Sequence, residues 1–381
     1  MSSSSHVTEV LRSGRTSYEF VRWLGPAHHG ELVLASRRHD GEFSGFTVIK
    51  RPVAPVSEEA RRRLMDEARL TSQLQHPNIL GGQQLKGPDD LPHLVMEHVV
   101  GYRLQSLLEA ARQSQQPFTE AFACHLVAEV ADALNHAHTL VDEHGRELGV
   151  VHRDVTPHNI LISEHGSVKL LDFGAAWSRL AERVGTEGPV LQGSLAYAAP
   201  EHVLRLPLDG RADQFALGII LLQLLTGRHL FEGADRFDAR QRRSRPPETD
   251  ATRQCTLELT ERIRGYSTQD LEAATRSVPE ALRAIVVRAL APERTDRFPS
   301  CAHLSHALRE HLHDTGQYFG RHEVLAEVVT LRYIALRIEA GEAPDDALSE
   351  RHLPPMGARS APQALASHRA ARPRGGVPRR R

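Results

Sequence analysis

The chain has 381 residues, of which 40% are hydrophobic and 25% are charged, and its formal net charge is −1. These values are ordinary for a globular protein with a sizeable core, and they argue against wholesale nucleic-acid binding. Three scattered cysteines without a CxxC spacing favour a reduced protein over a disulfide framework or a zinc site. The start lacks the apolar core of a secretory signal, and no apolar run is long enough to span a bilayer. We therefore expect a cytoplasmic protein without a membrane span.

Short strands are expected from Tyr18 onward. The runs "YEFVRWLG", "ELVLASRR" and "GFTVIKR" are separated by short connections rich in turn residues, which is typical of an antiparallel meander. Residues 1–16 are polar, and we expect them to be flexible. Gly25 and Gly30 flank the first connection, where backbone N–H groups can approach a phosphate only if side chains stay small.

A helix is expected next, from Glu58 to about Gln75, with Ser57 as its N-cap. Its inward stripe is apolar apart from one threonine and Glu67, and a desolvated carboxylate without a partner is costly. Lys50 ends the third strand in a largely apolar run, so it is the cation that could meet this acid. Either residue alone would more often be a surface charge. Together they indicate a buried pair that could orient a phosphate.

Two more strands are expected, near "NILGGQQL" and "LPHLVMEHV", and the chain then becomes mainly helical. Thr119 can cap a long helix that runs to about Leu140. The run "FALGIILLQLLTG" is apolar nearly all round, which is typical of a buried central helix, and Gly227 can end it. This order predicts an α+β fold of two lobes, a small β-rich lobe at 17–97 and a larger helical lobe at 98–313.

The later part of the chain divides into three further segments. Residues 232–254 are polar, and we expect a loop there. Residues 314–350 are expected to form a helical extension, with its helix at about 323–340. The tail at 351–381 is expected to be disordered, because it is rich in proline, alanine and arginine and its last 30 residues contain no acid. The tail is either a solvated end or an electrostatic anchor for nucleic acid, anionic lipid or an acidic partner, and such an anchor would weaken with salt.

The stretch "GVVHRDVTPHNILISEHGSVKLLDFG" contains a predicted hairpin, "NILIS" and "SVKLLD" joined by "EHG". Strand pairing would bring Asn159 beside Asp172, and their hard oxygen atoms suit Mg²⁺ (or Mn²⁺). Asp154 lies five residues before Asn159, where its carboxylate could accept a proton from an incoming hydroxyl group. In isolation Asp172 would be read as a turn cap and Asp154 as an ordinary loop acid, so the hypothesis depends on their combination.

These features together resemble the eukaryotic-like (Hanks-type) serine/threonine protein kinases found in bacteria. The resemblance extends from about Tyr18 to His313. It follows the order of the glycine loop, Lys50, Glu67, "HRDVTPHN", "DFG", "AAPE" and "DGRADQFALG". It implies a bilobal kinase fold and ATP-dependent phosphorylation of Ser and Thr on protein substrates, including autophosphorylation, in cytoplasmic signalling.

The resemblance also assigns roles to individual residues. Lys50 would hold the α- and β-phosphates with Glu67 as its anchor, Asp154 would be the catalytic base, and Asn159 and Asp172 would bind the metal ions. The other residues with an implied contact to ATP are Leu24, Gly25, Gly30, Leu32, Val48, Met96, Glu97, Val99 and Leu161.

Further implied roles concern the loops around the catalytic base. Asp213 would brace the "HRD" loop, and Glu201 would pair with Arg297. Arg153 would read a phosphorylated residue in the segment that runs from Asp172 to Glu201. The candidate phosphosites in this segment are Ser178, Thr186 and Ser194, with plain surface exposure as the alternative for Ser178.

Two departures from the family pattern affect the expected rate. Ala27 replaces the middle glycine of the phosphate loop, and Thr156 replaces the lysine that would neutralise charge on the transferring phosphoryl group. We expect slower turnover than is typical, with a nucleotide-binding pseudokinase scaffold as the alternative. The "AAPE" motif disfavours a small-molecule phosphotransferase, and tyrosine specificity is less favoured but stays open. The sequence does not reveal the substrate, the activating signal or the oligomeric state.

Overall fold

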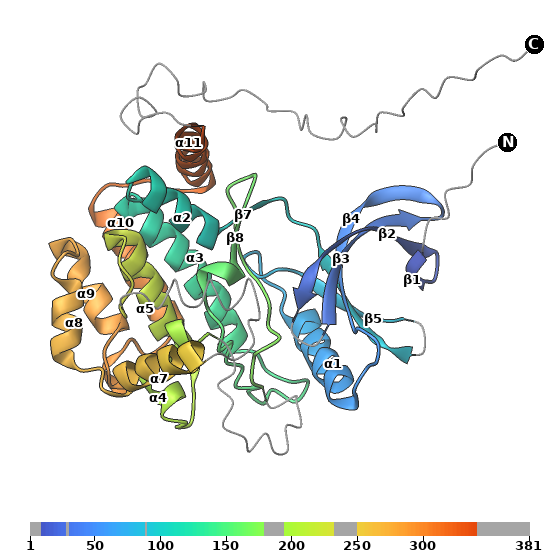
Figure 1. The fold of residues 1–381 in the computed structure, drawn as a ribbon, viewed down its shortest axis with the longest axis horizontal. Coiled ribbons are helices and arrows are strands. Elements are labelled where there is room, and N and C mark those ends of the chain that lie inside the picture. The colour runs from blue at the N-terminus through green and yellow to red at the C-terminus, as the bar shows by residue number, and fades with distance from the viewer. Residues whose placement is uncertain (1–8, 28–29, 88–89, 179–193, 232–249, 341–381) are drawn as a thin grey trace, which may run out of the picture.

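The structure is a computed structural model that describes residues 9–27, 30–87, 90–178, 194–231 and 250–340. It has two lobes, a β-rich lobe with one helix and a larger, mainly helical lobe, and the connection between them follows β6 (Figure 1). The predicted bilobal α+β fold is therefore confirmed. Among the described residues, none of the helices combines the length and hydropathy needed to span a bilayer.

The smaller lobe is built on a six-stranded antiparallel sheet with the strand order β1-β2-β3-β4-β6-β5. Its strands are β1 (Glu9–Ser13), β2 (Thr16–Ala27), β3 (Gly30–His39), β4 (Glu42–Arg51), β5 (Gly82–Lys86) and β6 (Pro92–Glu97). Helix α1 (Glu58–Gln73) packs on β5 and β6. The predicted meander corresponds to β2, β3 and β4. The Ser57 hydroxyl accepts a hydrogen bond from Ala60 N at the start of α1, as the sequence indicated.

The expectation of a flexible start is wrong for residues 9–13, which form β1. Val10 and Leu11 are buried and join Tyr18 in the core of the sheet. Gly14 follows with a φ of +57°, a left-handed conformation that glycine adopts without strain, so the chain turns directly into β2. The prediction failed because the first 16 residues are polar on average. Two apolar side chains among them, Val10 and Leu11, are enough to add an edge strand.

The larger lobe surrounds one buried helix, α5 (Gly210–Thr226), which packs against α3 (Glu120–His138), α9 (Glu280–Ala289) and α10 (Cys301–Asp314). All side chains of α5 from Ala212 to Leu224 are buried, and Gly227 ends the helix with a φ of +68°, as predicted. The other elements of this lobe are β7 (Gly101–Arg103), α2 (Leu104–Ser114), the 3₁₀ turn η2 (Pro157–Asn159), β8 (Ile160–Ser163), β9 (Val168–Leu170), the 3₁₀ turn η3 (Leu195–Tyr197), α4 (Pro200–Val203), α7 (Asp250–Arg264), α8 (Thr268–Thr275), the 3₁₀ turn η4 (Arg294–Asp296) and α11 (Arg321–Glu339).

One loop prediction needs correction, because α7 begins at Asp250, inside the segment expected to be a loop. The rest of that segment, residues 232–249, lies outside the described part of the chain. Residues 250–254 have the polar composition of a loop, but they form the first turns of a helix whose later residues Leu259 and Ile263 are buried. The buried apolar residues that stabilise this helix lie after residue 254, outside the segment for which the loop was predicted.

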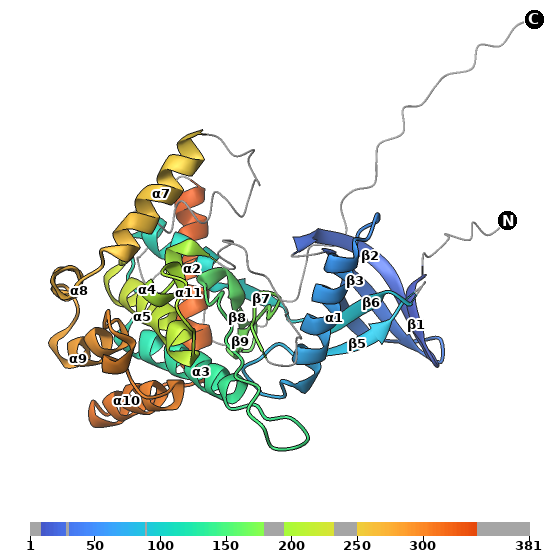
Figure 2. The ribbon, with the colours of Figure 1, turned by 90° about the horizontal axis from the view of Figure 1, so that it is seen from below.

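The predicted helical extension is present as α11, which lies against α2 and α3 (Figure 2). Its Glu327 carboxylate accepts hydrogen bonds from the N–H and the hydroxyl group of Thr119, at 2.8 and 2.7 Å. Thr119 is the N-cap of α3, so a side chain of α11 completes the cap of the helix beneath it. The tail at 351–381 lies outside the described residues.

We expect Glu327→Gln to destabilise the fold by roughly 1–2 kcal/mol, because an amide N–H₂ would replace one acceptor of a helix cap. The melting temperature, followed by circular dichroism, should fall by a few degrees. Glu339→Gln at the exposed end of the same helix is the matched control and should leave it unchanged. Equal melting temperatures for both variants would show that apolar packing alone holds α11.

Candidate active site

A buried ion pair joins the sheet to helix α1. Lys50 Nζ lies 2.7 Å from both carboxylate oxygens of Glu67 and 3.6 Å from Asp172 Oδ1. The side chains of Lys50 and Glu67 are only 3% and 4% exposed. A Cβ atom on Gly174 would lie 2.8 Å from Asp172 Oδ1 and 3.0 Å from Glu67 Oε2, so glycine at this position lets the two carboxylates approach. The Lys50–Glu67 pair predicted from the sequence is therefore confirmed, and Asp172 joins it.

The Lys50 ammonium group faces two carboxylates in this cluster. Burial raises the pKa of Glu67 to about 7, and although the Lys50 ammonium opposes this rise, the Asp172 carboxylate adds to it. Burial alone would lower the pKa of Lys50, but the Asp172 and Glu67 carboxylates raise it. The Lys50 ammonium group is thus shared by the buried Glu67 carboxylate and the partly exposed Asp172 carboxylate. Such a site suits a further cation, which would relieve the repulsion between the two acids.

The β8–β9 hairpin supplies a second oxygen donor for that cation. Ile160 pairs with Leu170, and Leu171 N donates to Asn159 O at 2.8 Å, so the hairpin brings Asn159 beside the residue that precedes Asp172. Asp172 has a φ of +60°, a conformation that costs energy for a residue with a side chain and is concentrated at functional sites. A carboxylate and an amide oxygen are hard ligands, so Asp172 and Asn159 fit a divalent ion such as Mg²⁺.

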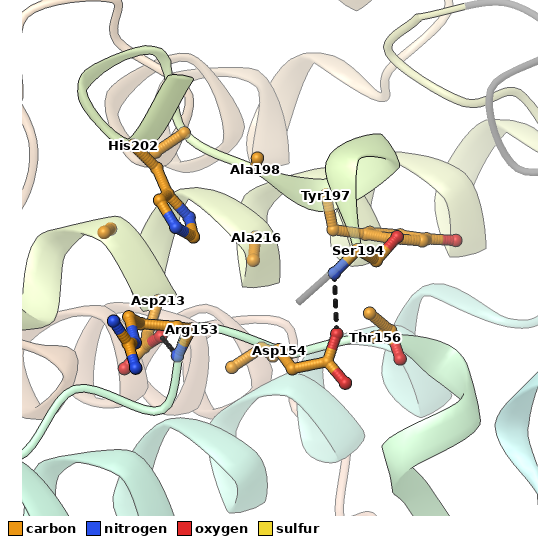
Figure 3. A pocket seen from close by; sticks show the side chains of 12 residues that line it. Arg153, Asp154, Thr156, Ser194, Tyr197, Ala198, His202, Asp213 and Ala216 are labelled. Carbon is orange, nitrogen blue, oxygen red and sulfur yellow. Dashed lines mark hydrogen bonds between the residues drawn. The ribbon is translucent and has the colours of Figure 1, made fainter. Parts of the chain in front are cut away.

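The Asp154 carboxylate is fixed by hydrogen bonds on both oxygens. Asn159 Nδ2 donates to Asp154 Oδ2 and to the Asp154 carbonyl oxygen, both at 2.8 Å. The Ser194 N–H donates to Oδ1 at 2.8 Å, as Figure 3 shows. The same asparagine that flanks Asp172 thus also orients Asp154. The predicted grouping of these three residues in one site agrees with this geometry.

The loop that carries Asp154 is held in place by hydrogen bonds to α5. Asp213 accepts hydrogen bonds from the backbone N–H groups of His152 and Arg153, at 2.8 and 2.9 Å. Its Oδ2 also lies 2.8 Å from Nε2 of His138, at the end of α3. Burial alone would raise the pKa of Asp213, but these hydrogen bonds and the charge of His138 lower it. Sequence reasoning predicted the brace at Asp213 and missed His138, whose only signal was its position at the end of the predicted helix.

Thr156 is completely buried beside this base. Within the described part of the chain, no hydrogen-bond partner reaches its hydroxyl group. Thr156 lines a narrow cavity together with Asp154, Ser194 and Tyr197. Eight further residues, from the loop that carries Asp154, from the segment 198–202 and from α5, complete the lining, and Figure 3 labels several of them. The hydroxyl group therefore adds no charge and no observed hydrogen bond where a lysine was expected.

Several of the predicted nucleotide contacts lie on one face of the six-stranded sheet. Leu32 lies directly opposite Lys50 across β3 and β4, and Val48 lies two residues before Lys50 on the same face. Val48 also pairs with Met96 of β6. The Glu97 side chain turns toward Gly81 and Lys169 instead, which leaves only its backbone for the predicted role. Val99 follows in the connection between the lobes, and Leu161 lies in β8.

The phosphate-loop hairpin requires glycine at two positions. Gly25 has a φ of +145°, and a Cβ atom on Gly30 would lie 2.3 Å from the Arg51 carbonyl oxygen. Leu24 is partly exposed beside Gly25. The tip of this hairpin at residues 28–29 lies outside the described residues. Ala27 ends β2.

The candidate phosphosites differ in their surroundings. Ser178 is 4% exposed, so the alternative of a plain surface hydroxyl is wrong. Ser194 is also buried, with its N–H bonded to Asp154. Thr186 lies outside the described residues. Arg153 donates from Nε to the Ala175 carbonyl oxygen, and its role as a phosphate reader stays a prediction.

The predicted Glu201–Arg297 pair is present. Arg297 donates to both carboxylate oxygens of Glu201, at 2.7 and 2.9 Å, and its side chain is completely buried. Its guanidinium group also lies over the Phe215 ring, 4.7 Å from the centroid. Arg297 thus connects the "AAPE" motif to α5. The segment from Asp172 to Glu201 is therefore anchored at its end to the helix that also holds the Asp154 loop.

The combination of features defines a class of protein. A buried Lys–Glu pair, two hard oxygen donors and a fixed carboxylate in a two-lobed fold are the parts that phosphoryl transfer requires, because that reaction depends on positioning and charge neutralisation.

The comparisons agree with this class. Residues 18–308 match the family model described as "Protein kinase domain", and the chain belongs to this protein kinase family. It is 30% identical to Tyrosine-protein kinase MasK of Myxococcus xanthus over 78% of this chain and 44% of that one. It is 33% identical to Serine/threonine-protein kinase PrkC of Bacillus subtilis over 58% and 32% of the two chains. The PknI kinase domain of Mycobacterium tuberculosis aligns with a TM-score of 0.50 and 26% identity over 77% of this chain and 96% of that one. The chain spans less than half the length of these curated relatives.

We expect the His138–Asp213 pair to make stability depend on pH. Burial would lower the pKa of His138, but hydrogen bonds with Asp213 and Cys301 raise it to about 10, well above the value of about 6.5 for an unfolded histidine. A raised pKa means that its stabilisation is complete below pH 6.5 and is lost as pH rises toward 10.

The melting temperature of the wild type should therefore fall more steeply between pH 7 and 10 than that of His138→Asn. Exposed His144→Asn is the control and should follow the wild type. Parallel curves for the wild type and His138→Asn would contradict a charged His138.

Proposed function

We propose that this kinase transfers the γ-phosphoryl group of ATP to Ser and Thr hydroxyl groups of protein substrates, including its own chain. The observation that carries the proposal is the contact of the buried Lys50–Glu67 pair with Asp172. Relatives named serine/threonine-protein kinases, PrkC of Bacillus subtilis and Pkn1 of Myxococcus xanthus, support the choice of acceptor.

Different residues would bind the phosphates, the metal ion and the adenine ring of ATP. Lys50 would hold the α- and β-phosphates, with Glu67 fixing the ammonium group, and Asn159 and Asp172 would hold a divalent ion, Mg²⁺ or Mn²⁺. When bound, that ion would neutralise negative charge on the phosphates. Leu32, Val48 and their neighbours in the sheet would cover the adenine ring.

Asp154 would accept the proton of the incoming hydroxyl group. Its two carboxylate oxygens are oriented by Asn159 and Ser194, and Asp213 holds the loop that carries it. An oriented base of this kind typically contributes about 10²–10⁴ in rate. The hydroxyl oxygen would attack the γ-phosphorus as its proton leaves to Asp154, and the bond to the leaving β-phosphate oxygen would break.

Regulation would act through the segment after Asp172. We propose Ser178, Thr186 and Ser194 as candidate sites of autophosphorylation. Because Ser178 and Ser194 are buried, the segment would have to move before either hydroxyl could react.

Tyrosine is the second acceptor to consider. The relative MasK of Myxococcus xanthus is named a tyrosine-protein kinase, and Thr156 replaces the lysine usual in serine/threonine enzymes. Phosphoamino-acid analysis of the labelled protein separates the two acceptors.

We expect Asp154→Asn to lower phosphoryl transfer by about 10²–10⁴, because an amide cannot take the proton. Transfer of labelled γ-phosphate to the chain and to a general protein substrate is the measurement. ATP affinity should be retained, since Asp154 does not contact Lys50 or Glu67. Equal transfer by the variant would overturn the assignment of the base, and no transfer by the wild type would favour a scaffold.

We expect Thr156→Lys to accelerate transfer by about tenfold or more, because a charge-assisted hydrogen bond is worth about 1.5–3 kcal/mol. Thr156→Val removes the hydroxyl group at similar volume and should leave the rate near that of the wild type, since the hydroxyl has no partner among the described residues. A large loss in Thr156→Val would show instead that the hydroxyl contacts the reacting groups.

A further inference from the structure

The side chain of Glu31 connects three strands of the six-stranded sheet. Glu31 lies in β3 directly after Gly30, which belongs to the phosphate-loop hairpin. Its Oε2 accepts a hydrogen bond from Trp23 Nε1 of β2 at 3.0 Å, and its Oε1 accepts one from Arg51 Nε of β4 at 2.8 Å. One carboxylate therefore joins the two strands of the hairpin to each other and to β4.

These contacts lie on the face of the sheet that is opposite to the Lys50 side chain. Glu31 is directly opposite Arg51 across β3 and β4, and opposite residues in an antiparallel pair share a face. Successive side chains of a strand alternate between the two faces, so Lys50 and its partner Leu32, one residue away, point to the other side. Glu31 can therefore influence a bound nucleotide only through the position of the hairpin.

The ion pair with Arg51 is made where β3 lies very close to β4. A Cβ atom on Gly30 would lie 2.3 Å from the Arg51 carbonyl oxygen, so glycine allows this close approach. Arg51 directly follows Lys50 in the chain, and Glu31 thus holds the residue next to the predicted phosphate-binding lysine. The side chains of Arg51 and Glu31 are 33% and 21% exposed. Because a partly buried pair is screened less by solvent, it favours one position of the hairpin relative to β4.

Trp23 contributes to this arrangement mainly through its N–H group. Its side chain is 55% exposed, so burial of the ring adds comparatively little. The indole nitrogen can only donate, and its acceptor is the Glu31 carboxylate. Gly25 follows two residues later with a φ of +145°, a conformation that suits glycine. The hydrogen bond of Trp23 therefore restrains β2 just before a residue whose own backbone is intrinsically free.

We propose that Glu31 is a positioning residue for the phosphates of ATP. By joining β2 and β3 to β4, it holds the backbone at Gly25 and Gly30 in a fixed place relative to the Lys50 ammonium group, so that the hairpin and the lysine bind the same phosphates. Loss of the Glu31 contacts would leave the adenine contacts in place and would weaken the binding of the phosphates alone. This inference rests on the proposed kinase function and adds a residue that sets its affinity for ATP.

The test compares three ligands by isothermal titration calorimetry with the full chain. The ligands are ATP and ADP, both with Mg²⁺, and adenosine, which has no phosphate. Glu31→Gln keeps the shape of the side chain and removes its charge, and Arg51→Gln removes the other charge of the pair. The double variant and the melting temperature of each protein complete the set.

Glu19→Gln is the matched control. Glu19 lies toward the start of β2, away from the phosphate loop, and its Oε2 also accepts hydrogen bonds from β3, from Arg38 Nε at 2.7 Å and from Ser36 Oγ at 3.3 Å. The side chains of Arg38 and Glu19 are 39% and 23% exposed, close to the values for Arg51 and Glu31. The control therefore removes a similar ion pair between strands at a place that does not position the phosphates.

Glu31→Gln should weaken the binding of ATP and ADP by about three- to fivefold, the scale expected for one partly exposed ion pair, and should leave the affinity for adenosine unchanged. Arg51→Gln should act in the same way, and the double variant should bind about as tightly as either single variant, because both changes break the same pair. Glu19→Gln should bind all three ligands like the wild type. In transfer assays of Glu31→Gln, the KM for ATP should rise by the same factor with kcat nearly unchanged.

Three results would overturn the inference and leave the proposed function intact. The first is a Glu31→Gln variant that binds ATP and ADP as tightly as the wild type. The second is an equal loss of affinity for ATP, ADP and adenosine, which would show that Glu31 only stabilises the fold. The third is an equal effect of Glu19→Gln. A wild type that binds neither ATP nor adenosine would instead contradict the proposed function together with the inference.

Discussion

The carboxylate of Asp213 is the interaction on which the active-site geometry depends. It is an acid buried in the first turn of a largely apolar helix, so it must be satisfied by hydrogen bonds. Its partners are two consecutive backbone N–H groups of the catalytic loop and the imidazole of His138. Because α5 is buried on all sides, Asp213 holds the backbone of His152 and Arg153 in a fixed position. Arg153 can then keep a positive φ of 62°, which a solvated loop would not hold.

Charge is distributed unevenly around this rigid centre. Two carboxylates share the ammonium group of Lys50 on the nucleotide side, so that side attracts cations. Beside the base, the buried Thr156 contributes no charge. A polar group that is buried and unpaired is unfavourable, so Thr156 is tolerated only because a hydroxyl group is small and costs little compared with an ionised group.

The chain adds structure outside the region that matches the kinase family. Strand β1 precedes residue 18, and α11 follows residue 308. Strand β1 pairs with β2 and adds two buried apolar side chains to the core of the sheet. Helix α11 buries five apolar side chains and supplies the Glu327 cap of α3. Helix α11 also places Arg332 over the ring of Tyr102, which neighbours Arg103 in β7. The extension therefore also contacts strand β7.

The order of the lobes, the helices with strong apolar periodicity and the motif residues could all be predicted from the sequence. These follow from local rules, such as the period of apolar side chains, the cap at Ser57 and the cost of an unpaired acid at Glu67. Sequence patterns did not predict that β1 joins the sheet, that α7 begins at Asp250, that His138 completes the bonds of Asp213 or that Glu327 completes the cap of α3. Each of these depends on residues far apart in the chain whose contacts arise from packing, and a local pattern carries no information about which distant partner a side chain will meet.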